Sequence, residues 1–333
     1  MEKRYFGTLD SGEVIHTYTL KNDIAELTVT DRGAAVVGFC AYGTDVVLGF
    51  DTLDGYVKDT SYQGVTVGRV ANRIEGASFS MDGAFFMVTD NEGGNCLHGG
   101  NGFQYKRWEL KTYTYNSLTF SYFSPDGEEG FPSDLLCEVT FTLVEASLII
   151  SYRATPFGKT PISLTNHSFF NLDGVGGDIK EQKIKIYADS YTAVNESLIP
   201  TGERPSVFGT EFDFTDFKKI GEHFGDGFEG YDHNFILKPK FYGEFLGTKL
   251  PLAAEVLSDR LMLSVYTDRP GVHFYSGGYL GDGPDFKGGV PQTRYGGFCL
   301  EAQIEPDSVN HGIGFYDAGD IYTQLTVYEI IKR

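Results

Sequence analysis

The sequence is poor in basic residues. Its 333 residues include 27 Lys and Arg against 46 Asp and Glu, which gives a net charge of −19. Binding to a polyanion depends on clustered Lys and Arg, so this balance excludes a nucleic-acid partner. The same shortage argues against a phosphorylated substrate, unless basic residues gather locally in one pocket.

Long hydrophobic runs and cysteine pairs are also absent. The longest apolar runs, such as Leu148-Ile149-Ile150, are far too short to cross a bilayer, and the first residues contain no apolar signal-peptide core. The four cysteines lie far apart without a CxxC pair, which argues against a disulfide framework or a cysteine-based zinc site. We expect a cytoplasmic protein without a membrane partner; the mature form of a secreted protein is the alternative.

Three common catalytic signatures are missing. The chain has no HExxH zinc motif, no GxSxG nucleophile elbow, and no Gly-rich loop between a strand and a long helical pattern. These absences argue against a zinc protease, a serine hydrolase of the elbow type and a nucleotide-dependent α/β enzyme. Nothing in the sequence indicates a metal or an organic cofactor.

Glycine and aromatic residues are abundant, with 42 Gly and 15% Phe, Trp and Tyr. Tight turns use Gly and strands favour aromatic residues. Apolar and polar residues alternate in short segments between turn residues, as in 138–143, 261–266 and 323–328. This pattern predicts an all-β fold, a large antiparallel β-sandwich with very little helix, in one domain over residues 1–333. The best helical candidate is Thr215 to Phe224, with apolar residues at helical spacing.

Three residues suggest acid/base chemistry. His98 precedes two glycines, His167 lies in the polar Thr165-Asn166-His167-Ser168 stretch, and Glu301 alternates with apolar residues in 298–304. A histidine in a cleft can exchange a proton near neutral pH, and a carboxylate on a rigid strand is a well-placed base. Each residue also has an ordinary structural interpretation, as a turn histidine, a hydrogen-bonded histidine or a solvated glutamate.

Other polar residues fit a neutral ligand. Arg69 and Arg73 occupy one short stretch, and Asp232 precedes a histidine, while Lys clusters are absent. Such mixtures of carboxylate, amide and guanidinium groups hydrogen-bond hydroxyls, and aromatic rings pack against sugar C–H faces. The alternative for the arginines is pairing with surface carboxylates.

Seven segments resemble the aldose 1-epimerase family, whose members are also called galactose mutarotases. The resemblance covers nearly the whole chain in the order of the family. The segments are GRVANRI (68–74), LHGG (97–100), PISLTNHSFFNLDG (161–174), SLIPTGE (197–203), GYDHNFIL (230–237), RPGVHFYSGGYL (269–280) and FCLEAQIEPDSVN (298–310).

The resemblance implies the galactose mutarotase-like supersandwich and interconversion of the α and β anomers of neutral aldohexoses such as galactose and glucose, without a cofactor. The matching motifs imply Glu301 as the general base at the C1 hydroxyl and His167 as the general acid at the ring oxygen. The implied sugar-binding residues are Asn72, Arg73, His98, Asp232 and His273. The expected partner is therefore a small-molecule monosaccharide.

The sequence departs from the family pattern at three places. His273 stands where Gln is usual, Phe169 replaces a usual Tyr or Trp, and the loop after LHGG is one residue shorter. The His273 replacement bears on substrate preference and pH dependence. Three alternatives remain: an epimerase of hexose 6-phosphates, a non-catalytic sugar-binding protein on the same fold, and a glycosidase using Glu301 with Asp232.

Overall fold

The computed structural model describes residues 1–225 and 227–333. Its largest sheet has ten strands, and its strand pairs are antiparallel. In spatial order the strands are β11 (Glu109–Tyr113), β12 (Ser117–Ser124), β13 (Leu135–Val144), β14 (Ser147–Pro156), β27 (Tyr322–Lys332), β23 (Leu261–Thr267), β22 (Thr248–Leu257), β17 (Lys183–Ile186) and β19 (Lys218–Lys219), with β21 (Tyr242–Phe245) paired to β22.

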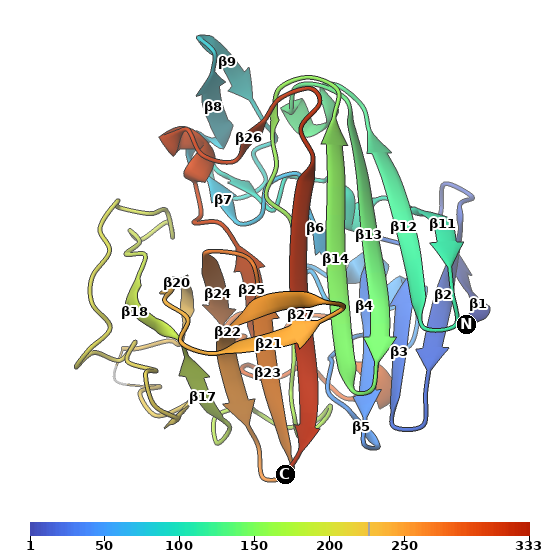
Figure 1. The fold of residues 1–333 in the computed structure, drawn as a ribbon, viewed down its shortest axis with the longest axis vertical. Helices are drawn as coiled ribbons and strands as arrows, with labels where there is room; N and C mark the ends of the chain where they lie inside the picture. The colour runs from blue at the N-terminus through green and yellow to red at the C-terminus, as the bar shows by residue number, and fades with distance from the viewer. Residues whose placement is uncertain (226) are drawn as a thin grey trace.

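Two further antiparallel sheets pack against this one. The first contains β1 (Glu2–Thr8), β2 (Val14–Lys21), β3 (Ala25–Thr30), β4 (Ala35–Ala41) and β5 (Thr44–Asp45). The second contains β18 (Ala188–Tyr191), β20 (Asp232–Leu237), β24 (Gly271–Tyr275) and β25 (Cys299–Gln303). Side chains from all three sheets share one buried apolar cluster. In Figure 1 the long strands β12–β14 stand in front of β2–β4, which form part of the second layer.

Short elements connect the sheets. The two-stranded ladders pair β6 (Thr66–Val67) with β16 (Thr165–Asn166), β7 (Arg73–Ile74) with β10 (Cys96–Leu97), β8 (Ser78–Met81) with β9 (Ala84–Met87), and β15 (Thr160–Pro161) with β26 (Phe315–Tyr316). The helical elements are α1 (Leu53–Lys58) and the 3₁₀ turns Glu75–Ala77, Phe103–Tyr105, Glu128–Gly130, Lys287–Gly289 and Ser308–His311. No helix among the described residues has the length and apolar character needed to cross a bilayer.

The alternating segments form strands, as predicted. Residues 138–143 lie in β13, 261–266 in β23 and 323–328 in β27. Along β13, Val139 and Phe141 are fully buried, whereas Glu138 and Thr140 are only partly covered. Burial of one face of each strand supplies the main favourable free energy of such sheets. The prediction of an all-β, antiparallel fold with very little helix is confirmed.

The predicted helix from Thr215 to Phe224 is wrong. This segment instead contains the short strand β19, which pairs with β17, followed by turns. Ile220 is fully buried and its backbone N–H donates to the Gln182 carbonyl. Hydrogen bonds to neighbouring segments therefore satisfy the backbone N–H and C=O groups that a helix would pair within itself. Gly221 also makes a helix less favourable.

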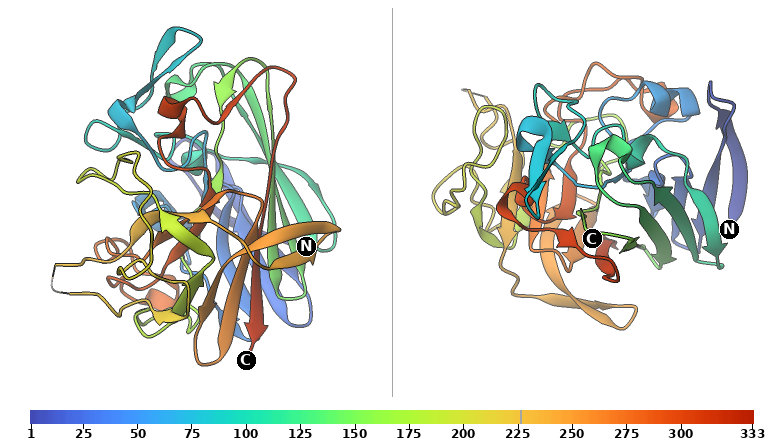
Figure 2. Two further views of the ribbon diagram at one scale, coloured as in Figure 1. Left: turned by 60° about the vertical axis from the view of Figure 1, so that its left-hand side comes forward. Right: turned by 90° about the horizontal axis from the view of Figure 1, so that it is seen from above.

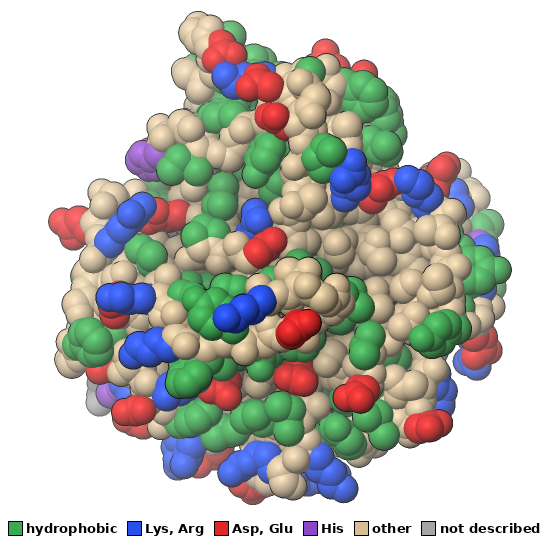
Figure 3. Space-filling model, viewed as in Figure 1, with side chains coloured by type: hydrophobic (Ala, Val, Ile, Leu, Met, Phe, Trp, Pro, Cys, Tyr) green, Lys and Arg blue, Asp and Glu red, His purple; other side chains and the backbone are tan. Residues whose placement is uncertain are grey.

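The surface mixes charges of both signs. On the face shown in Figure 3, acidic side chains are scattered among basic and neutral ones. The hairpin β8–β9 projects from the layers in Figures 1 and 2. Its apolar side chains Phe79 and Phe86 stack on each other and cover a small core of their own.

Candidate active site

A cavity of about 520 Å³ lies between the four-stranded sheet and the segments that carry β7, β10 and β16. All the site residues selected from the sequence line this cavity: Asn72, Arg73, His98, His167, Asp232, His273 and Glu301. They come from segments more than 200 positions apart in the chain, as the contact between Asn72 and His273 shows. The fold thus brings the whole predicted set to one place.

The register of the four-stranded sheet places three of these residues on one face. His273 of β24 lies opposite Glu301 of β25 on one side and Asn234 of β20 on the other, and Asp232, two positions before Asn234 in β20, lies on the same face. Directly opposite residues point to the same side of a sheet. The opposite face carries apolar side chains such as Phe274 and Leu300, which are buried in the core. Both faces of β25 are therefore covered, and Glu301 is not the solvated glutamate of the alternative interpretation.

Strand β25 is fixed to the ten-stranded sheet by side chains of β27. The Tyr328 hydroxyl donates to the Leu300 carbonyl at 2.9 Å, and Gln324 Nε2 donates to the Ala302 carbonyl at 3.0 Å. These two carbonyls flank Glu301 on β25, which is the outermost strand of this sheet among the residues described. The bonds satisfy edge carbonyls and hold the Glu301 backbone in place.

The opposite wall of the cavity contains strained backbone. His98 has φ of 54° and Asn72 has φ of 62°, both in the left-handed region that disfavours side chains other than Gly and Asn. Two hydrogen bonds join them: the His98 N–H donates to the Asn72 carbonyl at 3.0 Å, and the Asn72 N–H donates to His98 Nδ1 at 3.2 Å. Strained backbone conformations of this kind are often found at sites where a side chain must point toward a ligand.

Gly99 explains why glycine follows His98. Its φ is +74°, and a side-chain carbon there would lie 2.3 Å from the Gly68 carbonyl oxygen. Any other residue would push the His98 turn away from the segment that begins at Gly68. The first glycine of the Gly-Gly pair therefore permits a close approach of two backbones.

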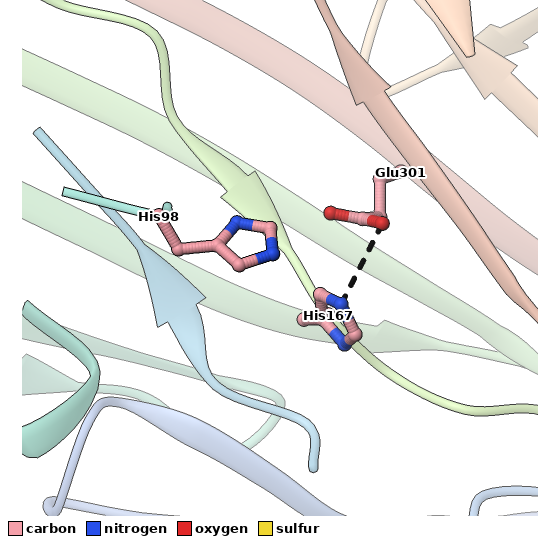
Figure 4. Close-up of side chains that lie close together, drawn as sticks. All are labelled: His98, His167 and Glu301. Atoms are coloured by element: carbon pink, nitrogen blue, oxygen red, sulfur yellow. Dashed lines mark ion pairs between the residues drawn. The ribbon is translucent and has the colours of Figure 1, made fainter. Parts of the chain in front are cut away.

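His98, His167 and Glu301 converge at the floor of the cavity (Figure 4). His167 Nε2 lies 3.7 Å from Glu301 Oε1, and the two imidazole rings are 5.1 Å apart and nearly perpendicular. The Tyr62 ring packs against both histidines, with centroids at 4.8 Å and 5.8 Å. His167 follows β16 directly, and its N–H donates to the Val65 carbonyl at 2.9 Å. A backbone hydrogen bond thus aims this histidine at the carboxylate.

Burial changes the proton affinities of this group. Glu301 is 1% exposed and His167 5%. Desolvation, with the nearby Asp232 charge, raises the pKa of Glu301 well above its usual range. Desolvation lowers the pKa of His167 to about 4, and it also lowers the pKa of His98. Burial penalises the charged form of each group, so all three favour their neutral states.

Glu301 has an unused hydrogen-bonding atom. Its Oε2 is buried and contacts no hydrogen-bond partner among the described residues. A buried carboxyl oxygen without a partner costs free energy of about 1–3 kcal/mol. Such an atom at the floor of a cavity is a position where a ligand hydroxyl would be stabilised.

A chain of charged and polar groups lines one side of the cavity. Arg73 binds Glu92 through two bonds of 2.7 Å, and its Nη1 lies 3.9 Å from Asp232 Oδ2. Asp232 Oδ1 lies 2.6 Å from His273 Nε2. Burial alone would raise the pKa of Asp232, but the contact with His273 and the charge of Arg73 lower it overall. Asp232 is therefore ionised, with Arg73 beside it.

The tautomer of His273 follows from its neighbours. The backbone N–H of Arg73 donates to Asn72 Oδ1 at 2.9 Å. The side-chain amide nitrogen of Asn72 therefore faces His273 Nδ1, at a distance of 3.4 Å. His273 Nδ1 must then accept, so its Nε2 carries the hydrogen that is donated to Asp232. The histidine in the usual glutamine position thus occupies one Asp232 oxygen and joins both walls of the cavity.

His98, His167 and Glu301 also have the residue types of a metal site, with donor atoms within 4.8 Å of one another. However, His98 Nδ1 accepts the Asn72 N–H, so the neutral ring carries its hydrogen on Nε2. A ring nitrogen that bears a hydrogen has no lone pair for a metal. The three groups therefore fit hydrogen bonding to a polar ligand better than they fit metal binding.

Several residues around the cavity were not singled out from the sequence. They are Tyr62, Glu92, Tyr275, Tyr279 and Cys299. Tyr275, Tyr279 and Cys299 lie inside the matched segments, which was the only available signal. Conversely, Arg69 does not line the cavity: it is buried and donates to Ser124, Pro125, Pro132 and Thr160. Phe169, a second departure from the family pattern, packs against the His167 ring with ring centroids 5.1 Å apart.

Comparisons with known proteins show which family this chain resembles over most of its length. A sequence model of the family described as aldose 1-epimerase matches residues 16–329. Galactose mutarotase of Homo sapiens is 40% identical over 92% of this chain and 90% of its own length. Aldose 1-epimerase of Escherichia coli K12 is 35% identical over 97% of both chains. The solved structure of an aldose epimerase homologue from C. elegans covers 95% of this chain and 98% of its own, with a TM-score of 0.87 and 29% identity.

Proposed function

Because this chain belongs to the aldose 1-epimerase family, we propose that it interconverts the α and β anomers of neutral aldohexoses such as galactose and glucose. The observation that carries this proposal is the pair formed by His167 and Glu301, 3.7 Å apart and buried at the floor of a cavity large enough for a sugar ring. Ring opening of a hemiacetal needs one base and one acid on adjacent oxygens, and this pair supplies both.

The reaction is balanced by proton transfers alone. Glu301 takes the proton of the C1 hydroxyl, a C1–O1 double bond forms, and the C1–O5 bond breaks with its electron pair moving to O5. His167 Nε2 donates a proton to O5. Rotation about C1–C2 then presents the other face of the aldehyde, and the reverse transfers close the ring. Each such transfer typically contributes about 10²–10⁴-fold to the rate.

Burial favours the ring-opening direction. The transfers start from the less favoured ionised form of the pair, with carboxylate on Glu301 and imidazolium on His167, and they leave both groups neutral. Since burial raises the pKa of Glu301 and lowers that of His167 to about 4, it stabilises the neutral pair. The same environment that makes ionisation costly therefore favours both transfers of ring opening, from the C1 hydroxyl to Glu301 and from His167 to O5.

The remaining polar groups suit sugar hydroxyls. His98 Nε2–H is a donor for the ring oxygen or a neighbouring hydroxyl, and Asp232 offers acceptor oxygens beside the Arg73 guanidinium. Asn72 and His273 fix these groups through their own hydrogen bonds. Holding the open chain in place during rotation keeps the reacting atoms oriented for closure.

The alternatives receive less support from the cavity. Its lining contains one arginine, already paired with Glu92, against the carboxylates Glu92, Glu196, Asp232 and Glu301. A phosphate group would meet net negative charge there, which disfavours a hexose 6-phosphate. A binding protein without activity has no need for a buried acid/base pair.

We also propose that residues 1–333 form one aldose 1-epimerase-like domain in the cytoplasm. The buried cluster shared by the three sheets supports the single domain. The four cysteine side chains are free thiols, which supports a reducing compartment.

Polarimetry of freshly dissolved α-galactose tests the function. The wild-type protein accelerates the change in optical rotation, and Glu301→Gln lowers kcat by at least about 10²-fold, because the amide cannot accept the C1 hydroxyl proton. Glu26→Gln, at an exposed glutamate paired with Lys21, serves as the control and keeps full activity. Full activity of Glu301→Gln would reject the assigned base, and no acceleration by the wild type with any of galactose, glucose or xylose would reject the function.

A further inference from the structure

Strand β25 contacts both ring nitrogens of His167. Glu301 Oε1 lies 3.7 Å from Nε2, and Cys299 Sγ lies 3.6 Å from Nδ1. Cys299 and Glu301 are two positions apart on the same strand, so their side chains point to the same face. The proposed reaction uses Nε2 and Glu301 but gives no role to the thiol.

The reaction places a condition on Nδ1. If Nε2 gives its proton to the sugar and takes it back, the ring alternates between imidazolium and the neutral form without hydrogen on Nε2. In both states the hydrogen on Nδ1 must stay, because a neutral imidazole holds one hydrogen. A hydrogen-bond acceptor beside Nδ1 is therefore needed to keep the neutral ring in the right tautomer.

Cys299 Sγ is the side-chain atom within hydrogen-bond distance of Nδ1 among the residues that the structure describes. The backbone carbonyl of His167 also favours a hydrogen on its own ring. It accepts the Gly64 N–H at 2.9 Å, and its second lone pair acts together with the Cys299 sulfur to favour the same tautomer. The other neighbours of the ring are the aromatic groups of Tyr62, Phe169 and His98.

A thiol suits this position because it is a weak, uncharged acceptor. Cys299 is fully buried, and burial raises the pKa of its thiol well above the usual range, so the sulfur stays neutral. A carboxylate in its place would hold His167 in the protonated form and slow release of the proton. A neutral sulfur orients the ring without fixing its charge.

We propose that Cys299 is a positioning residue that keeps the hydrogen of neutral His167 on Nδ1 and so frees Nε2 for the proton transfer. This inference rests on the proposed function for its consequence in catalysis, but the tautomer itself can be measured without any activity.

The test combines ¹⁵N NMR of histidine-labelled protein at neutral pH with polarimetry. In the wild type, the ring nitrogens of His167 show a hydrogen on Nδ1 and a free lone pair on Nε2. Cys299→Ala shifts the neutral ring toward hydrogen on Nε2 and lowers kcat about 10-fold with little change in KM. Cys299→Ser, which keeps an acceptor, retains the tautomer and most of kcat. His167→Gln identifies the signals.

Cys137→Ala provides the matched control, because Cys137 is equally buried but lies in β13 away from the cavity. It changes neither the His167 tautomer nor the ratio of kcat to KM. The inference is overturned if the wild-type ring carries its hydrogen on Nε2, or if Cys299→Ala keeps the wild-type tautomer, whatever its rate. A wild type without mutarotation would reject the proposed function, while the NMR result still decides the tautomer.

Discussion

At the scale of single residues, the site depends on one proton shared by two groups. Glu301 and His167 are both buried, and burial moves their pKa values apart, upward for the carboxyl and down to about 4 for the imidazole. The pair is competent for the proposed reaction only while it holds one proton in total, on either group. The pH range of activity therefore reports the pair and not either residue alone.

This sharing predicts the pH profile of kcat/KM. Below about pH 4 His167 becomes protonated while Glu301 is still protonated, so no base is left and the rate falls. On the alkaline side the rate falls when the last proton leaves, which requires a pH above the ordinary glutamate value of 4.5 because burial raises the pKa of Glu301. A rate profile from pH 3 to pH 9 measured by polarimetry checks both limbs. An acid limb centred near pH 6 to 7, as for an ordinary histidine, would contradict it.

At the scale of elements, the two arginines of one short segment have different tasks. Arg73 ends in the cavity, whereas the Arg69 guanidinium donates hydrogen bonds to the loops around Ser124 and Pro132 and to Thr160. These bonds fasten the segment that carries Asn72 and Arg73 to the ten-stranded sheet. Burial lowers the pKa of Arg69 to about 10, so the guanidinium remains charged at neutral pH.

Arg69→Met should therefore reduce the stability of the fold. The substitution leaves several buried acceptors without a donor, and we expect the free energy of unfolding to fall by about 3–5 kcal/mol. Urea unfolding followed by tryptophan fluorescence measures this loss. Arg4→Met, at an exposed arginine, should leave the urea midpoint of unfolding close to that of the wild type. A loss below about 1 kcal/mol for Arg69→Met would show that the loops find other partners.

The elements also show what the sequence could and could not predict. Period-2 alternation located β13, β23 and β27 because one face of each strand is buried, and the family motifs located the seven cavity residues. The alternation around Glu301 did not reveal that its polar face is buried too, since the covering residues come from distant segments. Likewise, spacing alone suggested a helix at 215–224 because the pairing partner of β19, Lys183–Ile186, is far away in the chain. The role inferred for Cys299 depends on a contact with His167 that no local pattern contains.

At the scale of the whole molecule, the acidic surplus fits an uncharged ligand. The net charge is −19, and the cavity lining itself carries more carboxylates than cations. The negative potential of the protein does not change the binding free energy of a neutral sugar, whereas it repels an anionic sugar.

Salt dependence should separate the two kinds of substrate. Between about 0.05 M and about 0.5 M NaCl, we expect KM for galactose to stay within about 2-fold, because no ionic attraction is screened. For galactose 6-phosphate we expect KM to be at least about 10-fold higher at low salt and to fall as salt rises. Initial rates of mutarotation at several salt concentrations give both values. A lower KM for the phosphorylated sugar would instead favour the hexose 6-phosphate alternative.

The position of β27 has a consequence for how the molecule assembles. This strand follows every other strand in the sequence, yet it lies between β14 and β23 in the ten-stranded sheet, and its side chains hold β25 on either side of Glu301. Until residues 322–332 pair with β14 and β23, the sheet has two halves with open inner edges, and the proposed base lacks the two bonds that hold its strand. Such non-local pairing makes folding slow and late. In the proposed enzyme, one strand thus closes the sheet and positions the base in the same folding step.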